Sequence, residues 1–283
     1  MLELGVGADL LRGVGWIIWG LFGLALLAAL IKPETLAAKA VCSLMVIALF
    51  VLPMIPGAYE NYVFKQRYAK AKALFDERCK TAGEKIYKKV VEVEGVMLSN
   101  VRSRGISTSV LSDPSWPDAA LPHEPSQDGY IMTFLLWEQY QDKRNDRGYL
   151  NNKPSDRPGF KFVDVSEANG SIYRHRLVLP AAREMSRELL NGKPARFAVS
   201  FANMTEPTDR QLWVAGTKVT ITDSATQEVM AEKVWYAIEP GQGDTSGDRS
   251  PWAFARQCPS HIGWSGGSTR FFVDQVLSPS KGK

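Results

Sequence analysis

Two apolar stretches near the N-terminus decide the architecture of this chain: GVGWIIWGLFGLALLAALI (residues 13–31) and AVCSLMVIALFVLPMIPGAY (residues 40–59). Neither contains a charged residue, and only the segment KPETLAAK (residues 32–39) separates them. At about 1.5 Å per residue, roughly 20 apolar residues cross the ~30 Å hydrocarbon core of a bilayer. The sequence therefore predicts a two-helix transmembrane hairpin, with the N-terminus and everything after residue 59 on the same side of the membrane.

A cleaved signal peptide is the alternative interpretation of the first stretch. It is disfavoured because Arg12 is the only basic residue before the stretch, beside Glu3 and Asp9, and a second span follows at once. Small residues at positions 15, 20, 23 and 28 leave the first span a surface that Ser43 and Ala48 of the second span could meet. The same surface permits a homo-oligomer through the hairpin.

Charge and cysteine usage disagree about the orientation of the hairpin. The loop between the spans carries two lysines, whereas four basic residues follow the second span: Lys65, Arg67, Lys70 and Lys72. By the positive-inside rule, this asymmetry favours a cytoplasmic domain.

The three cysteines favour the opposite side. Cys42 lies inside the second span, which leaves Cys79 and Cys258 as one pair in the soluble part. Such a pair suits a disulfide in an oxidising compartment, although two unlinked buried thiols would look the same in sequence. On the residues alone, the pairing and the orientation both stay open.

Composition excludes one class of partner. The formal charge is +4, from 34 basic and 30 acidic residues that are interspersed, so there is no electrostatic footprint for nucleic acid. The basic residues after the second span are better suited to contact with membrane lipid headgroups. With 45% hydrophobic residues, the part after the hairpin can bury one core.

The pattern after residue 59 predicts a juxtamembrane helix over residues 60–90 and an α+β domain over residues 91–283. An apolar stripe recurs every three or four positions in the helix, at Tyr68, Ala71, Phe75, Cys79, Ala82 and Ile86. Strands are predicted over residues 91–98, 130–137, 160–165, 172–179 and 197–201, and a hairpin over 212–222 and 228–238. Short helices are expected over 180–190, over 252–256 and from a cap at Ser268, and loops over 103–127 and 142–158. Because turns and loops join adjacent strands, we expect a mainly antiparallel sheet.

No motif predicts a reaction. Residues 263–267 match the nucleophile-elbow pattern around Ser265, but no adequate strand precedes this serine and no histidine follows it. The three histidines are isolated, and no HxH, CxxC or HExxH spacing occurs. We therefore expect no catalytic residue, no metal and no cofactor.

Two features suggest binding. Gly241 and Gly243 lie between a predicted strand and a short helix, with Arg249 at the mouth of the loop, which would suit a small anion or a lipid headgroup. The lysine and hydroxyl residue of a nucleotide loop are missing, and an ordinary solvent-facing connection is the alternative. Trp252 and Trp264 lie near the glycine-rich segments and would anchor a protein partner if exposed, or fill the core if buried.

Several landmarks together resemble a set of uncharacterised proteobacterial membrane-anchored proteins. The landmarks are Cys79-x-x-Ala82-Gly83-x-x-Ile86-Tyr87, Trp213-x-Ala215-Gly216, Ala231-Glu232, Gly241-x-Gly243, Arg249-Ser250-Pro251-Trp252-x-Phe254-Ala255 and Cys258-Pro259. Such proteins are similar to proteins found near secreted antibacterial lipase effectors, which implies an immunity or accessory role by analogy. The resemblance also favours a Cys79–Cys258 disulfide and hence a periplasmic domain.

The leading prediction is a bacterial inner-membrane protein, not an enzyme, whose periplasmic domain binds another protein, in the manner of an immunity protein. A membrane-bound sensor of a small anionic ligand or lipid headgroup, using the loop from Gly241 to Arg249, is the alternative.

Overall fold

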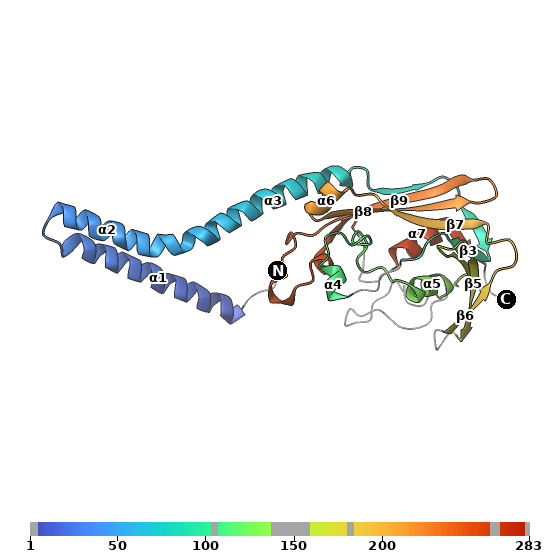
Figure 1. The fold of residues 1–283 in the computed structure, drawn as a ribbon, viewed down its shortest axis with the longest axis horizontal. Helices are drawn as coiled ribbons and strands as arrows, with labels where there is room; N and C mark the ends of the chain where they lie inside the picture. The colour runs from blue at the N-terminus through green and yellow to red at the C-terminus, as the bar shows by residue number, and fades with distance from the viewer. Residues whose placement is uncertain (1–4, 103–106, 137–158, 180–183, 261–266, 281–283) are drawn as a thin grey trace. The chain divides into compact units, whose positions relative to one another are not determined.

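The computed structural model describes residues 5–102, 107–136, 159–179, 184–260 and 267–280. The chain divides into two units, Met1–Gln66 and Arg67–Lys283, and we describe each by itself. An N-terminal helical region and a mainly sheet domain confirm the α+β class predicted from the sequence (Figure 1).

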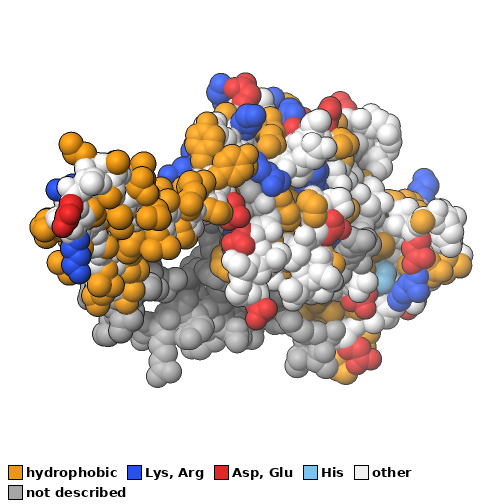
Figure 2. Space-filling view, turned by 60° about the vertical axis from the view of Figure 1, so that its left-hand side comes forward, with side chains coloured by type: hydrophobic (Ala, Val, Ile, Leu, Met, Phe, Trp, Pro, Cys, Tyr) orange, Lys and Arg blue, Asp and Glu red, His pale blue; other side chains and the backbone are white. Residues whose placement is uncertain are grey.

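The first unit is helical. Helices α1 (Gly5–Ile31) and α2 (Leu36–Val51) run side by side, and α2 continues through a 3₁₀ turn η1 (Leu52–Met54) into α3 (Ile55–Cys79) (Figure 1). Two helical segments, Gly13–Ile31 and Leu36–Cys79, contain stretches long and apolar enough to cross a membrane. Most large apolar side chains of these stretches are exposed, with Trp16 79% exposed and Leu49 72% exposed, and Figure 2 shows this surface in orange. An apolar exposed surface of this extent needs a covering, and lipid would supply one.

The three glycines of the predicted small-residue surface of α1 do not meet α2. A Cβ atom built on Gly15, Gly20 or Gly23 would have no other atom within 4 Å. The two helices are instead joined by an aromatic contact in which the ring centroids of Phe22 and Phe50 are 5.2 Å apart.

The second unit is built on a mixed sheet, which has nine strands in the part of the chain described. Eight strands lie in the order β1-β9-β8-β7-β3-β4-β5-β6, and β10 pairs with β9. Their bounds are β1 Gly83–Ile86, β3 Gly95–Leu98, β4 Phe162–Ser166, β5 Ile172–Leu179, β6 Glu184–Leu189, β7 Phe197–Asn203, β8 Val214–Asp223, β9 Glu228–Ile238 and β10 Arg256–Cys258. The central strand β3 is parallel to both neighbours, β4 and β7, and the other pairs are antiparallel. A second sheet pairs β2 (Val90–Val93) with β11 (Leu277–Pro279) in parallel.

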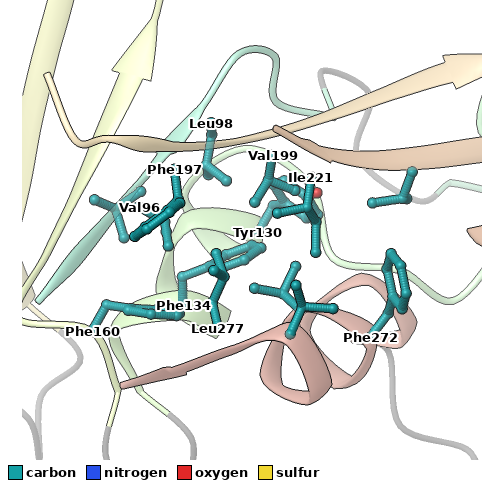
Figure 3. Close-up of a cluster of buried hydrophobic side chains, with 14 of the residues drawn as sticks. Val96, Leu98, Tyr130, Phe134, Phe160, Phe197, Val199, Ile221, Phe272 and Leu277 are labelled. Atoms are coloured by element: carbon teal, nitrogen blue, oxygen red, sulfur yellow. The ribbon is translucent and has the colours of Figure 1, made fainter. Parts of the chain in front are cut away.

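Helices cover one face of the large sheet. Side chains from β3, β7 and β8 meet those of α5 (Asp128–Leu135) and α7 (Ser268–Val276) in the main core, as Figure 3 shows. Val96, Leu98 and Ile221 contribute from the strands and Phe134 and Phe272 from the helices, each with 0% of its surface exposed. The remaining helical pieces are short: α4 (Thr108–Leu111), α6 (Pro207–Gln211), η2 (Ser246–Asp248) and η3 (Pro251–Phe254).

Two elements differ in type from the sequence prediction. The run from Tyr130, predicted as a strand, forms α5, where the amide of Leu136 donates to the Met132 carbonyl at 2.8 Å. All of its last six residues are buried, so the run has no polar face that could reveal its period. The helix predicted over residues 180–190 is wrong where it can be checked, because Glu184–Leu189 forms edge strand β6 against β5. Pairing with β5 overrides the helical propensity of this segment.

Two helix ends also differ. Helix α3 stops at Cys79 instead of continuing to Lys89, because Gly83 adopts a φ of 121° and the next residues pair with β9. Ser268 is the first residue of α7 and not its cap; Gly267 precedes it with a φ of 127°. The loop predicted over 142–158 lies outside the described residues, and the loop over 103–127 contains the short helix α4.

The strand predicted over residues 91–98 is divided between β2 and β3, which lie in different sheets. The remaining strand predictions are confirmed, with β8 and β9 forming the predicted hairpin around the turn at residues 224–227. The Cys79–Cys258 disulfide is also present, with a Cα–Cα distance of 5.8 Å. It ties the C-terminal end of α3 to β10.

Candidate functional site

The glycine-rich loop after β9 already holds an anion, which is the carboxylate of Glu239. The amides of Gly241 and Gly243 donate to Oε1 and Oε2 of Glu239, each at 2.7 Å. The guanidinium of Arg249 forms an ion pair with the same carboxylate, and Glu239 is 0% exposed. The three residues predicted to hold a ligand anion do come together, but their donor groups already bind the carboxylate of Glu239.

Both glycines are required by this arrangement. A Cβ atom at Gly241 would lie 2.6 Å from Nη1 of Arg249, and one at Gly243 would lie 2.4 Å from the Trp213 ring. Gly243 also has a φ of 88°, a conformation that side chains disfavour. The glycines therefore form a structural cradle, which is the loop whose amides bind the Glu239 carboxylate. The predicted ligand site at this loop is corrected to an internal contact of the chain.

Trp252 is a core residue. It is 0% exposed, packs on Trp213 with ring centroids 5.2 Å apart, and donates from Nε1 to the carbonyl of Asp113 at 2.9 Å. The hypothesis that Trp252 anchors a partner is therefore wrong, because a buried indole offers no surface. Trp264 lies outside the described residues, as does Ser265.

No group of three or more His, Cys, Asp or Glu side chains in the described ranges could hold a metal ion.

A pocket of about 800 Å³ lies where the parallel strands β3 and β4 end. Its walls come from the segment after β3, the first turn of α5, the end of β4 and the neighbouring strands β5 and β6: Ser99, Asn100, Val101, Arg102, Gln127, Asp128, Ile131, Val165, Ser166, Glu167, Ala168, His175 and Arg187. The carboxyl ends of adjacent parallel strands form a crevice in which many folds bind ligands. This volume lies within the usual range for a small-molecule site.

Arg102 is the most unusual group in this pocket. Its side chain is 1% exposed, and Nη1 donates to Oδ1 of Asp118 at 2.6 Å. Its other donor nitrogens, Nε and Nη2, are buried and have no hydrogen-bond partner in the described part of the chain. The guanidinium also lies over the ring of Phe201, with 4.4 Å between Cζ and the ring centroid.

The backbone holds Arg102 at the start of α5. Its carbonyl accepts a hydrogen bond from the Gln127 amide at 2.7 Å. Asn100 extends the pairing of β3 with β7 through its side chain, donating to the Phe201 carbonyl at 2.7 Å and accepting from the Phe201 amide at 3.0 Å. These hydrogen bonds hold Asn100 and the backbone of Arg102 in place between β3 and the pocket.

His175 forms a second unsatisfied group. It is 4% exposed on β5, opposite Val163 of β4 and Arg187 of β6, and its Nδ1 has no partner among the described residues. Burial, followed by the nearby charge of Arg187, lowers the pKa of His175 below its ordinary value; the carboxylates of Asp128, Glu167 and Asp164 oppose this shift. The imidazole is therefore neutral at neutral pH.

The first turn of α5 borders the pocket through Gln127, Asp128 and Ile131. The first amides of a helix have no partner within it, and the Gln127 side chain does not cap this one. The start of α7 differs, because the buried carboxylate of Glu124 accepts from the amides of Gly267 at 3.1 Å and Thr269 at 3.3 Å. The α5 start opens on the pocket, whereas the α7 start is filled by the protein itself.

A second pocket, of about 440 Å³, is lined by Arg210 near α6. Burial lowers the pKa of Arg210 to about 10, and its guanidinium donates to the carbonyls of Trp116 and Pro117. These carbonyls already occupy one of its two terminal nitrogens, and the side chain is only partly buried. This second pocket is accordingly the weaker candidate.

Sequence reasoning did not find Arg102, His175 or Arg187. The signal that was present is a polar segment, Ser99 to Arg102, directly after the buried strand β3. It became informative only once β3 was known to be parallel to β4 and α5 was known to be a helix.

Comparison with family models, curated proteins and solved structures gives no match to this chain, so the resemblance to membrane-anchored proteobacterial proteins stays a prediction.

Proposed function

We propose that this chain is a membrane-anchored binding protein whose folded domain holds a small anionic ligand in the pocket at the ends of β3 and β4. The single observation that carries the proposal is Arg102, a buried arginine on the pocket wall with two donor nitrogens that have no partner within the described residues.

The energetics of buried donors support a ligand there. Each buried polar group without a partner costs about 1–3 kcal/mol, and more when the group is charged. At two other places in this domain the chain's own carboxylates satisfy clustered donors, Glu239 in the glycine loop and Glu124 at α7. A ligand that brings an acceptor to Arg102 would remove the cost that remains in the pocket.

The anchor and the compartment rest on separate observations. The apolar, exposed helices of the first unit support insertion into a bilayer. The Cys79–Cys258 disulfide supports an oxidising compartment, and so the periplasmic side of a bacterial inner membrane. We give the disulfide more weight than the basic residues after the second span, because large domains translocate despite flanking charge.

The orientation can be tested with the thiols. In intact cells with a permeabilised outer membrane, an impermeant reductant followed by an impermeant maleimide should label Cys79 and Cys258 of a Cys42→Ser background. Labelling that requires lysis of the inner membrane would put the domain in the cytoplasm and contradict this part of the proposal.

The ligand can be sought with the full chain in lipid nanodiscs. We expect native mass spectrometry after incubation with a bacterial small-molecule extract to show a bound species. Ser99→Trp, at the exposed rim of the pocket, should abolish that binding. Ser224→Trp, in the exposed turn between β8 and β9, is the matched control and should retain it. Equal binding to both variants would refute the pocket as the site.

The immunity or accessory role against a secreted effector stays a prediction from the resemblance. The burial of Trp252 removes one of the two tryptophans on which a protein partner was predicted.

A further inference from the structure

We infer that the ligand is a small-molecule monocarboxylate that accepts hydrogen bonds from Nε and Nη2 of Arg102. This inference rests on the proposed function and names the chemistry that the same pocket would recognise.

The edge of the guanidinium that has no partner in the described structure is the one that suits a carboxylate. Arg174 uses its Nε and Nη2 to hold Asp164, at 2.7 and 2.8 Å, and Arg196 holds Asp223 in the same way, at 2.8 and 2.7 Å. Arg102 instead contacts Asp118 through Nη1, so the same two-pronged edge remains without a partner in the described structure. Two parallel N–H donors match the two oxygens of a planar carboxylate.

The guanidinium is held in place before any ligand arrives. The Asp118 carboxylate fixes one of its ends, and the Phe201 ring lies against one face. A donor edge that is already oriented loses little conformational entropy on binding. Because Arg102 is buried, contact needs a small local movement of the pocket wall.

Charge favours a single negative charge on the ligand. The pocket wall carries the cations Arg102 and Arg187 and the anions Asp128 and Glu167. Arg187 is ion-paired to Glu167, Arg102 is ion-paired to Asp118, and His175 is neutral. A monocarboxylate would therefore be held by hydrogen bonds from Nε and Nη2 of Arg102, whereas the second charge of a phosphate dianion would meet Asp128 with no cation on the described wall left to neutralise it.

The rest of the wall accommodates a short apolar body. Ile131 and Val165 are buried and Val101 is half-buried, and all three line the pocket beside the charged groups. A pocket with apolar walls and a few convergent polar groups is the usual form of a metabolite site. The ligand would direct its carboxylate at Arg102 and lay its carbon chain against these residues.

The test is a binding titration of the full chain in nanodiscs at constant ionic strength. The probes are propionate, hexanoate and benzoate, the corresponding neutral amides, and inorganic phosphate. We expect at least one carboxylate to bind, with its amide and phosphate each about 10-fold weaker or more. Phosphate binding as tightly as the best carboxylate, or equal affinity for acid and amide, would overturn the inference.

The decisive variant is Arg102→Lys, which keeps the charge but removes the two-pronged edge. It should weaken carboxylate binding by about 10- to 100-fold. Arg196→Lys makes the same change at an edge that Asp223 already fills and should leave binding unchanged. Unaltered binding to Arg102→Lys would refute the role of the edge. If that variant fails to fold, the double variant Arg102→Gln/Asp118→Asn removes both buried charges together, and it too must lose carboxylate binding.

The two proposals can fail separately. If a species from the extract binds and Ser99→Trp blocks it while every carboxylate fails, the pocket is a ligand site and the carboxylate inference is wrong. If neither the extract nor any probe binds, the proposed function itself fails.

Discussion

Removing the Cys79–Cys258 disulfide should destabilise the folded domain without unfolding it. The two cysteines are 179 positions apart in the sequence. In the chain-entropy model, a cross-link that closes a loop of this length contributes about 5 kcal/mol, and removal of native disulfides from small domains typically costs about 2–5 kcal/mol. The bond joins the end of α3 to the short strand β10, outside the main core, so the core contacts should survive its loss.

The assay is thermal unfolding of the full chain in detergent micelles, followed by near-ultraviolet circular dichroism. For a domain of 150–250 residues, each kcal/mol moves the melting temperature by about 2–4 °C, so the double variant Cys79→Ser/Cys258→Ser should melt about 5–15 °C below the wild type. Reductant should lower the wild type to the same value. Cys42→Ser, which removes the free cysteine of α2, is the matched control and should melt like the wild type.

A melting temperature within about 2 °C of the wild type in the double variant would contradict a stabilising role for the disulfide. It would mean that other contacts, such as the ion pair of Arg78 with Asp209 at 3.1 Å, hold the end of α3 without help from the disulfide.

Three further predictions follow from the buried groups of the domain. Trp252→Ala should lower the free energy of unfolding in urea by about 3–5 kcal/mol, because it leaves a cavity in a packed site. Phe254→Ala, at a side chain that is 57% exposed, is the control and should lower it by less than about 1 kcal/mol. Equal losses would contradict the placement of Trp252 in the core. Glu239→Gln should cost about 3 kcal/mol in the same assay, because it leaves Arg249 without its buried partner, and a neutral result would contradict the cradle. His175 has a lowered pKa in the folded state, so the unfolded chain binds its proton first and stability should fall as the pH drops below about 6.5, by at most about 1.4 kcal/mol per pH unit. Melting curves between about pH 7.5 and pH 5.5 should lose this slope in His175→Gln and keep it in His123→Gln.

Much of the fold could be predicted because its patterns are local. In β8 the buried residues Val219 and Ile221 alternate with half-buried Thr220 and Thr222, and a turn separates this strand from an equally regular partner. The two N-terminal helices are long, uncharged runs, which need no tertiary information. Local pattern was sufficient at these places.

The failures occur where distant contacts decide the conformation. The segment from Tyr130 to Leu135 is apolar on all sides because the sheet and the rest of the core surround it, so its sequence carries no period. Strand β6 contains good helix formers and becomes a strand because β5 offers an unpaired edge. Neither partner can be recognised from the segment itself.

The candidate site was predicted in part. Gly241, Gly243 and Arg249 do converge, but no local pattern indicated that Glu239 would turn back into the loop that follows it. The Arg102 pocket forms only when β3, α5 and β4 pack together, and these elements are spread along the chain from Gly95 to Ser166. A ligand site of that kind appears only in the folded chain.

A spectrum of the arginine side chains can show directly whether Arg102 receives a ligand. In the full chain labelled with ¹⁵N-arginine in nanodiscs, one Nε–H signal that is missing from Arg102→Lys can be assigned to Arg102. We expect this signal to shift and saturate as a bound carboxylate is titrated, while the Nε–H signals lost in Arg174→Lys and Arg196→Lys stay in place. An Arg102 signal that does not move while ligand binds would contradict the central claim that this arginine receives the ligand.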